Sequence, residues 1–547
     1  MKRRVSPTAV VVACALWMAA VGNLPLWQRL DALGLLGSQR GATLVAGFAA
    51  IIAGGIVLAL GGLAWRWTLK PVAIALLLVT AVSSHFMLAY GVVIDPGMIV
   101  SAVQTNAQEA MPLLTGRLAA IAGALAIVPG WLVWRTPVDY GSTRRQLARN
   151  LSLMTLGVAC CLVAAFATLH VSASVMRNHK EVRYLVNPFA ALYSAGRVAE
   201  RRLAHEDASV HPMGEDATLA STEASGRRPT ILLLVLGETA RSGNFGINGY
   251  GRPTTPSLER EGAVSFRNAW SCGTSTAESV PCMFSGVGRA AFVRRNGMHE
   301  GLLDVLQRAG LAVLWIDNQT GCKGVCDRVP SASTAGNTGA ACTGGECFDD
   351  VMLEGLDRRI GALDPERVAR GLVIVMHPIG SHGPAYFRRS PESAKRFLPE
   401  CRSTLLDECT HDELVNAYDN SIAYTDAFLG RAIGWLRRHS DRADTALVYV
   451  ADHGESLGEN GLYLHGMPYL LAPDAQRHIP WITWVSEGFR ASTGLSVDCL
   501  RAEDGRRITH DSYFHSVLGL MGVATKAYDP ALDAYANCRG DLAAQDG

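Results

Sequence analysis

Acidic and imidazole side chains follow three aliphatic runs of the sequence, at the points where the runs end. The runs read TILLLVL (230–236), GLVIVM (371–376) and TALVYVA (445–451). Carboxylate oxygens and imidazole nitrogens are ligands that zinc accepts in proteins. The polar groups after the runs, with the histidine of YLHGMP, are Glu238, His377, His382, Asp452, His453, Glu455 and His465. Their types indicate a metal-binding site.

The segment SCGTSTAESVPC (271–282) contains a run of three consecutive hydroxyl side chains that could act as a nucleophile, those of Thr274, Ser275 and Thr276. A hydroxyl is a weak nucleophile at neutral pH, and this segment contains no basic residue to activate it. A metal ion would supply the activation, because it lowers the pKa of a bound hydroxyl as it does that of water. STAE (275–278) is also typical of a helix capping box. Both interpretations can hold together, since capping by Ser275 would leave Thr276 in the first helical turn, which favours phosphate.

Each of these groups also has an ordinary structural explanation when it is taken singly. Asp452 and His453 could form a turn with a capping carboxylate, and Glu238 could be a solvated strand end. His382 and His465 could be surface side chains of glycine-rich loops. Because all of them fall at the ends of expected strands or in loops nearby, we favour a common site.

The elements that must position this site alternate along the chain. The three runs and LAVLWID (311–317) are separated by helical patterns such as GLLDVLQRAG and NAYDNSIAYTDAFLGRAIGWLRRH. This alternation predicts an α/β domain over residues 229–547 with a mostly parallel central sheet. Ligands of such sheets bind beyond the carboxyl ends of the strands.

The N-terminal third of the chain is apolar. Five segments carry almost no charge and are near the length of about 20 residues that spans a bilayer; they cover residues 8–27, 41–65, 71–93, 118–134 and 150–171. They predict an α-helical membrane domain over residues 1–171. The first could be a signal peptide, since MKRR precedes it, but four further spans favour a retained helix. Residues 172–204 predict a connecting helix at the membrane surface and 205–228 a linker, which together form a connecting region, 172–228.

Basic residues predict the orientation of the spans. With the N-terminus inside, the inner segments carry nine lysines and arginines and the outer loops three. An odd number of spans then places the α/β domain outside the cytoplasm. The net charge of +1 argues against a nucleic-acid partner.

The cysteines support this placement. Three of the 13 lie in the expected spans, and the other ten form neighbouring couples in the α/β domain: Cys272/Cys282, Cys322/Cys326, Cys342/Cys347, Cys401/Cys409 and, further apart, Cys499/Cys538. An even set in an exported domain indicates disulfides. Zinc binding by these couples is the rival interpretation, but none has C-x-x-C spacing.

Several stretches of the sequence together resemble the lipid A phosphoethanolamine transferases. This family includes the mobile colistin-resistance enzymes and belongs to the alkaline phosphatase/sulfatase superfamily. The stretches are VLGETARSGNFGINGYGRPTTP, SCGTSTAESVPCMFSG, DNQTGCKGVCDRVP, HPIGSHGPAYF, NAYDNSIAYTD, ADHGESLGENGLYLHGMP and, in the membrane domain, YGVVIDPGMI. The resemblance covers nearly the whole chain, and with adjacency it implies that each cysteine couple is a disulfide.

The resemblance implies the roles of individual residues. Zinc would be bound by Glu238, Thr276, Asp452 and His453, with a second zinc as a further option. Thr276 would be the nucleophile that carries phosphoethanolamine as a covalent intermediate. Lys323, His382 and His465 match residues that contact the phosphoryl group or a second zinc, and either histidine could be an acid or base. Glu109 matches a residue implicated in binding lipid substrate, and Thr105 precedes it by one helical turn. Ser101 stands where the family often has Asn.

The resemblance also implies the reaction. A monomeric inner-membrane enzyme would transfer phosphoethanolamine from phosphatidylethanolamine to a phosphate of lipid A, which should weaken the binding of cationic peptides such as polymyxin. Transfer to inner-core sugars of lipopolysaccharide, or hydrolysis by a membrane-bound phosphodiesterase, are the alternatives within the superfamily. A sulfatase is disfavoured, because the segment lacks C-x-P-x-R and S-x-P-x-R. A non-catalytic scaffold is disfavoured too, because all four expected zinc ligands are present.

Overall fold

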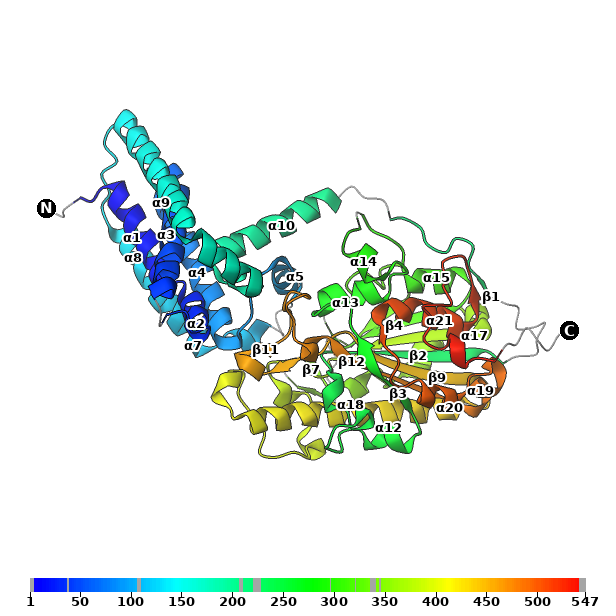
Figure 1. Ribbon diagram of the computed structural model, residues 1–547. Coiled ribbons are helices and arrows are strands. Elements are labelled where there is room, and N and C mark those ends of the chain that lie inside the picture. Colours follow the sequence, from blue (N-terminus) through cyan, green and yellow to red (C-terminus); the bar gives the residue numbers. More distant parts are fainter. Residues whose placement is uncertain are drawn as a thin grey trace. The chain divides into compact units, whose positions relative to one another are not determined.

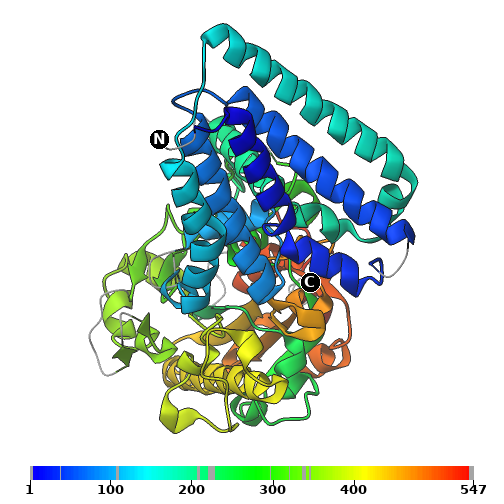
Figure 2. The same cartoon turned by 90° about the vertical axis from the view of Figure 1, so that its left-hand side faces the viewer.

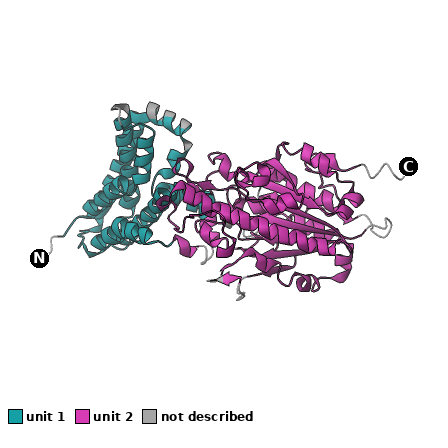
Figure 3. Ribbon diagram, turned by 90° about the horizontal axis from the view of Figure 1, so that it is seen from below, with its two compact units in different colours: residues 1–99, 114–200 teal, residues 100–113, 201–547 magenta. Residues whose placement is uncertain are grey.

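The computed structural model describes residues 4–36, 39–105, 110–205, 210–219, 228–295, 297–319, 321–334, 341–343 and 346–540. The chain forms two compact units (Figure 3). The first contains Met1–Ile99 and Leu114–Glu200, and the second contains Val100–Leu113 and Arg201–Gly547. The short segment Val100–Leu113 therefore belongs with the α/β unit, although it lies within the membrane part of the sequence.

The first unit contains the five expected apolar helices, which confirms that prediction (Figure 2). The candidate spans are Pro7–Ala32, Gly41–Gly62, Leu69–Tyr90, Gly116–Arg135 and Thr143–Leu169. They are built from α1 (Pro7–Ala20), α2 (Leu24–Ala32), α3 (Gln39–Gly62), α4 (Leu69–Tyr90), α7 (Gly116–Ala122), η2 (Gly123–Ile127), α8 (Val128–Arg135) and α9 (Thr143–Asn178). α5 (Pro96–Gln104) follows α4.

Two helix boundaries differ from the sequence prediction. The first span is broken into α1 and α2 at Asn23, whose side-chain amide donates to the Met18 carbonyl oxygen and to that of Asn187. The last span is expected to end at residue 171, but its helix, α9, continues to Asn178. A separate helix, α10 (Phe189–His205), follows in the sequence. The hydropathy of the sequence shows where an apolar segment ends, but the helix can continue beyond it with polar residues.

The second unit is built on an eight-stranded sheet with the order β13-β3-β12-β9-β2-β8-β4-β5 (Figure 1). All neighbouring pairs are parallel except those that β12 makes with β3 and β9. The strands are β2 (Thr230–Gly237), β3 (Val264–Trp270), β4 (Ala312–Asp317), β5 (Ser331–Ser333), β8 (Leu372–His377), β9 (Asp444–Ala451), β12 (His478–Val485) and β13 (Ile508–Thr509). The mostly parallel sheet expected from the sequence is confirmed.

The central strands are buried on both faces, which explains why their sequences are continuous aliphatic runs. Every residue of β4, β8 and β9 is buried. Figure 1 shows α18 (His411–His439) and α12 (Pro256–Arg260) on one face of the sheet, and α15 (Leu302–Arg308) and α21 (Tyr513–Met521) on the other. α18 begins at a capping box in which Thr410 and Glu413 bond to each other's backbone N–H groups. These layers fix the strand ends that carry the polar groups.

The region expected to be a linker also contains a short strand. β1 (Thr218–Leu219) pairs antiparallel with β14 (Val523–Ala524). Next to it, the Asp216 carboxylate accepts hydrogen bonds from the Thr525 hydroxyl and the Lys526 N–H. The segment is therefore tied to the C-terminal part of the α/β unit by partners that lie far away in sequence.

The second unit contains five disulfides. They join Cys272 to Cys282, Cys322 to Cys326, Cys342 to Cys347, Cys401 to Cys409 and Cys499 to Cys538. Four of them close loops with sequence separations of 4 to 10 residues, and the fifth spans 39. Most of these bonds therefore shape individual loops and do not link distant elements.

Candidate active site

Three ionisable side chains meet at the carboxyl ends of β2 and β9. Glu238 follows β2, and Asp452 and His453 follow β9, the parallel neighbour of β2. All three are fully buried, and each offers one ligand atom within 4.8 Å of the others. The His453 Nδ1–H donates to the Gly454 carbonyl oxygen at 2.9 Å, which leaves the Nε2 lone pair for the site.

Thr276 brings a hydroxyl to this cluster. It is the first residue of α13 (Thr276–Met283), and its Oγ1 lies 3.1 and 3.2 Å from the two carboxylate oxygens of Glu238. The same atom lies 3.4 Å from Nε2 of His453. The structure thus brings together the four residues that the sequence suggested as zinc ligands.

The chemistry of the cluster fits a zinc ion. Two carboxylates, one imidazole and one hydroxyl make four donors, the number that zinc usually takes. Asp452 Oδ2 is buried without a hydrogen-bond partner among the described residues, so it is available as a ligand. Burial and the charge of Glu238 raise the pKa of Asp452 to about 6. Burial also opposes ionisation of Glu238, but His377, His382 and His453 outweigh it and hold its pKa well below the usual range.

The helix start that carries Thr276 is not held by a capping box. Ser275 has the extended conformation of an N-cap residue, but its side chain makes no capping hydrogen bond. The preceding loop is held instead by its neighbours. The Ser279 hydroxyl accepts from the Gly273 N–H, and the Thr274 hydroxyl donates to the Met467 carbonyl oxygen. Thr276 is therefore positioned by a loop that is hydrogen-bonded to the segment around His465.

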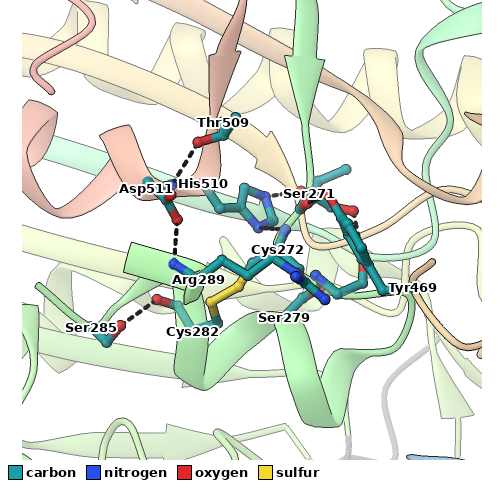
Figure 4. Close-up of a disulfide and its surroundings, with 12 residues drawn as sticks. Ser271, Cys272, Ser279, Cys282, Ser285, Arg289, Tyr469, Thr509, His510 and Asp511 are labelled. Carbon is teal, nitrogen blue, oxygen red and sulfur yellow. Dashed lines mark hydrogen bonds between the residues drawn. A yellow bond between two sulfur atoms is a disulfide. The ribbon is translucent and has the colours of Figure 1, made fainter. Parts of the chain in front are cut away.

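His510 joins this loop to the end of β9, the strand that precedes Asp452 and His453 (Figure 4). Its Nδ1 accepts from the Cys272 N–H at 3.0 Å, and its Nε2–H donates to the Ala451 carbonyl oxygen at 2.9 Å. Burial lowers the pKa of His510 to about 3, so the ring is neutral and can do both. β12 runs antiparallel to β9, and Trp481 lies opposite Val450, so the residue next to Ala451 on β12 is Pro480. Proline has no N–H that could donate to the Ala451 carbonyl oxygen. His510 therefore bridges two strand ends that β12 separates.

Replacing His510 with phenylalanine is expected to destabilise the protein. The ring would keep its volume but leave the Cys272 N–H and the Ala451 carbonyl buried without partners, at about 1–3 kcal/mol for each group. The thermal midpoint of the full-length protein in detergent measures the effect. The exposed His411→Phe is the matched control and should change stability by less than about 0.5 kcal/mol. Equal midpoints for the two variants would show that His510 does not hold these groups.

Two more histidines lie beside the cluster. The rings of His453 and His465 are 4.3 Å apart, and those of His465 and His382 are 5.7 Å apart. Burial lowers the pKa of His382 to about 3. Burial also opposes protonation of His465, but the Glu455 carboxylate, 2.8 Å from its Nδ1, outweighs this and raises the pKa to about 9. One ring is thus held neutral and the other protonated.

Residues at the ends of β8 and β4 also support the Glu238 carboxylate. His377, the last residue of β8, has its Nε2 3.5 Å from a Glu238 oxygen. Its Nδ1–H donates at 2.9 Å to Asp317, the last residue of β4. The second oxygen of Asp317 accepts from the Gly321 N–H and so holds the start of the Cys322–Cys326 loop. Lys323 lies in that loop with a φ of 53°.

The residues suggested for lipid binding lie in or next to α5. Ser101 is in α5, and Thr105 follows it and donates its hydroxyl hydrogen to the Ser101 carbonyl oxygen at 2.8 Å. Both belong to the second unit, as the catalytic cluster does. Glu109 lies outside the described residues.

Sequence reasoning missed some residues that support the site. It named Glu455 and His377 at strand ends but assigned them no role, and it passed over Asp317 and His510. Asp317 could have been found, because it ends an aliphatic run just as Asp452 follows one. His510 carries no such signal, since β13 before it is only two residues long.

Comparisons with known proteins agree with this geometry. A family profile described as Sulfatase matches residues 230–523, and one described as Phosphoethanolamine transferase EptA/EptB matches residues 52–203. Phosphoethanolamine transferase EptA of Escherichia coli K12 is 38% identical over 484 residues, 86% of each chain. Phosphatidylethanolamine transferase Mcr-1 of Escherichia coli is 37% identical over 536 residues, 95% of this chain and 96% of that one.

A solved structure covers the whole architecture. The integral membrane protein lipooligosaccharide phosphoethanolamine transferase A of Neisseria meningitidis superposes with a TM-score of 0.92 at 30% identity, over 98% of this chain and 100% of that one. The five apolar helices and this match make the chain an inner-membrane protein with a C-terminal periplasmic catalytic domain. The chain belongs to the phosphoethanolamine transferase family of enzymes.

Proposed function

We propose that this enzyme transfers phosphoethanolamine from phosphatidylethanolamine to a phosphate group of lipid A through a covalent intermediate on Thr276. The observation that carries the proposal is the position of the Thr276 hydroxyl, within 3.4 Å of Glu238 and His453 at the start of a helix. Glu238, Thr276, Asp452 and His453 would hold a zinc ion. When bound, zinc would lower the pKa of the hydroxyl and offset the negative charge of the phosphoryl oxygens.

In the first half-reaction, the hydroxyl proton of Thr276 passes to solvent, and the resulting alkoxide oxygen attacks the phosphorus of phosphatidylethanolamine. The bond from phosphorus to the diacylglycerol oxygen breaks, and that oxygen takes a proton, which His465 would donate because its raised pKa keeps it protonated. In the second half, an oxygen of the acceptor phosphate attacks the same phosphorus, the bond to Thr276 breaks, and the Thr276 oxygen takes back a proton from solvent. The free amides of the first turn of α13 favour the phosphoryl group throughout.

Further residues have roles in the same proposal. Lys323 and His382 would contact the phosphoryl group, and Glu109, Thr105 and Ser101 would contact lipid. A second zinc near His382 and His465 is the alternative to the acid role of His465, because that ring would have to lose its proton to bind a metal. We also propose the division into a membrane domain (1–171), a connecting region (172–228) and a catalytic domain (229–547), with α9 and α10 crossing its boundaries as described above.

A cavity in the second unit suits the lipid substrates. Its volume is ≈ 910 Å³, and it reaches the loop before His382 through Ile379. The Arg389 Nε–H donates to the His382 carbonyl oxygen at 2.7 Å. Apolar side chains line it together with arginines and glutamates, among them Met111, Pro112, Phe348, Phe387, Arg388, Arg389, Arg402, Glu346 and Glu392. Glu346 pairs with Arg389 and Glu392 with Arg402, so it is the apolar part of the lining that suits a molecule with acyl chains.

Glu455→Gln tests the role of His465. Loss of the carboxylate charge is expected to lower the pKa of His465, because Glu455 is what holds that pKa above its usual value. An acid works only while it is protonated, so the rate falls as the pH rises through its pKa. The alkaline limb of the pH profile of kcat/KM should therefore move to lower pH. Glu459→Gln, in the same loop, should leave the limb in place. An unmoved limb in Glu455→Gln would exclude His465 as this acid.

Mass spectrometry of lipid A tests the reaction. A Gram-negative host expressing the wild-type chain should gain a phosphoethanolamine increment on lipid A, and a host expressing Thr276→Ala at equal level should not. The new ammonium group lowers the net negative charge of the surface, so polymyxin should bind the first host more weakly. An increment on core sugars would support phosphoethanolamine transfer but show that the acceptor is a core sugar and not a lipid A phosphate. Release of the headgroup to water would indicate a phosphodiesterase, and no increment anywhere would overturn the proposal.

A further inference from the structure

Backbone strain in the second unit is concentrated around the candidate active site. Among the described residues, the non-glycine residues with a positive φ are Thr239, Lys323, Asn460 and Leu464. Thr239 follows Glu238, and Leu464 precedes His465. Thr239 is the only β-branched residue of this set, with a φ of 55°. A left-handed conformation costs such a residue about 1–3 kcal/mol and persists only where its surroundings fix it.

The surroundings of Thr239 do fix it. Tyr418, on α18, donates its hydroxyl hydrogen to the Thr239 carbonyl oxygen at 2.8 Å and accepts from the Arg241 N–H at 3.0 Å. Thr239 and Tyr418 are both fully buried. One buried hydroxyl therefore holds the backbone on both sides of Ala240, and the strained residue Thr239 lies at the first end of this turn.

In this conformation Thr239 donates to both carboxylates of the cluster. Its hydroxyl donates to Glu238 Oε1 at 2.7 Å, and its backbone N–H donates to Asp452 Oδ1 at 3.1 Å. The two carboxylates follow different strands, β2 and β9. Thr239 is thus a single residue whose hydroxyl and backbone N–H each reach one of the two acidic groups.

These bonds determine which carboxylate oxygens remain for a ligand. Asp452 Oδ1 also accepts from the His453 N–H at 2.7 Å, so it is occupied, whereas Oδ2 is left without a partner among the described residues. Asp452 Oδ2 lies 3.3 Å from His453 Nε2. Thr239 thus keeps Oδ2 beside the imidazole nitrogen that the site offers.

The Thr239 hydroxyl also keeps its hydrogen throughout the proposed reaction, so it can donate to Glu238 at every step. Thr276 donates to Glu238 while it is a free hydroxyl, but an oxygen bonded to phosphorus has no hydrogen to donate. Glu238 Oε1 then keeps the hydrogen bond from Thr239. The strained residue can therefore hold Glu238 in one orientation in both halves of the cycle.

We propose that Thr239 is a positioning residue that aligns the Glu238 and Asp452 carboxylates for metal binding, in a backbone conformation maintained by Tyr418. This inference rests on the zinc site of the proposed function. Glycine or asparagine would adopt the same φ with less strain, but neither has a hydroxyl to donate to Glu238. The proposed role therefore requires a hydroxyl side chain at a position where the positive φ disfavours threonine.

Isosteric substitution tests the proposal in the full-length protein in detergent. Thr239→Val keeps the shape and the branching but removes the hydroxyl, and Thr239→Ser keeps the hydroxyl. Zinc affinity is measured by competition with a fluorescent zinc chelator, and the thermal midpoint is measured on the metal-free proteins. Thr239→Val should bind zinc about 10–100-fold more weakly, as loss of a group that orients a ligand does. Thr239→Ser should bind like the wild type.

The matched control is Thr445→Val, a buried threonine at the other end of β9 from Asp452. It should lower stability without changing zinc affinity. A Thr239→Val protein that binds zinc like the wild type, with a lower metal-free midpoint, would reduce Thr239 to a structural role and overturn the inference. If valine prevents folding, Thr239→Ala against Thr239→Ser makes the same comparison. Absence of zinc binding in the wild type itself would instead overturn the zinc site of the proposed function.

Discussion

Replacing Thr276 with alanine is expected to lower the rate of transfer by at least about 10³-fold, as removal of a covalent nucleophile does. The alanine variant should fold, because the hydrogen bonds of the Thr276 hydroxyl to described residues all go to the cluster, and α13 is fixed by the Cys272–Cys282 loop and by His510. Purified enzyme given phosphatidylethanolamine without acceptor should gain one phosphoethanolamine at residue 276. Intact-protein mass spectrometry followed by peptide mapping measures this.

Thr276→Ser is the matched control for that experiment. It keeps the oxygen at the start of α13 and should retain measurable transfer and covalent labelling. Alanine should show neither. Labelling of the alanine variant at Thr274 or Ser275 would assign the nucleophile to a neighbouring hydroxyl, and undiminished transfer would remove Thr276 from the mechanism.

Removal of the metal is expected to have an effect of similar size. A chelator should abolish transfer, and zinc should restore it, because four of the cluster's donor atoms are proposed to share one ion. Asp452→Asn should lose most of its zinc and lower the rate by about 10³-fold, a loss comparable to that from one essential electrostatic group. Zinc content by elemental analysis and transfer rate should fall together.

The pH dependence of zinc binding gives a separate check on this prediction. Zinc requires an ionised Asp452, and burial with the neighbouring Glu238 raises the pKa of Asp452 to about 6 in the metal-free protein. Protons therefore compete with zinc, and the affinity should fall as the pH falls through this value. Asp444→Asn, at the start of the same strand, should leave the zinc content unchanged. Full activity after exhaustive chelation would contradict the zinc mechanism.

The sequence predicted the parts of the fold that depend on local pattern. Aliphatic runs such as TILLLVL became β2, because a strand buried on both faces has no polar alternation and can be read directly. The cluster of Glu238, Asp452 and His453 followed from one rule about strand ends, and the structure places the three together. The choice of Thr276 among three hydroxyls came from resemblance, since the segment itself does not distinguish them.

The parts that could not be predicted depend on contacts between distant residues. His510 lies far from Cys272 and Ala451 in sequence, and its role exists only once β3, β9 and the C-terminal segment have come together. The φ of Thr239 is disfavoured by its own side chain, so propensity points away from the conformation that the fold imposes through Tyr418. Functional sites are where local preference and the final structure are expected to disagree.

The short disulfide loops have a consequence for the biogenesis of the enzyme. Each of the four close couples can form as soon as its own segment has crossed the membrane, because its two cysteines emerge within 10 residues of each other. The Cys272–Cys282 loop, which contains Thr276, precedes Asp452 and His453 in the chain and can be oxidised before they arrive. Cys499–Cys538 is the exception, because Cys499 must wait for a partner 39 residues later. Pairing in order of emergence leaves each thiol few wrong partners, so a periplasmic oxidant alone suffices for the close couples, and a disulfide isomerase has little to correct.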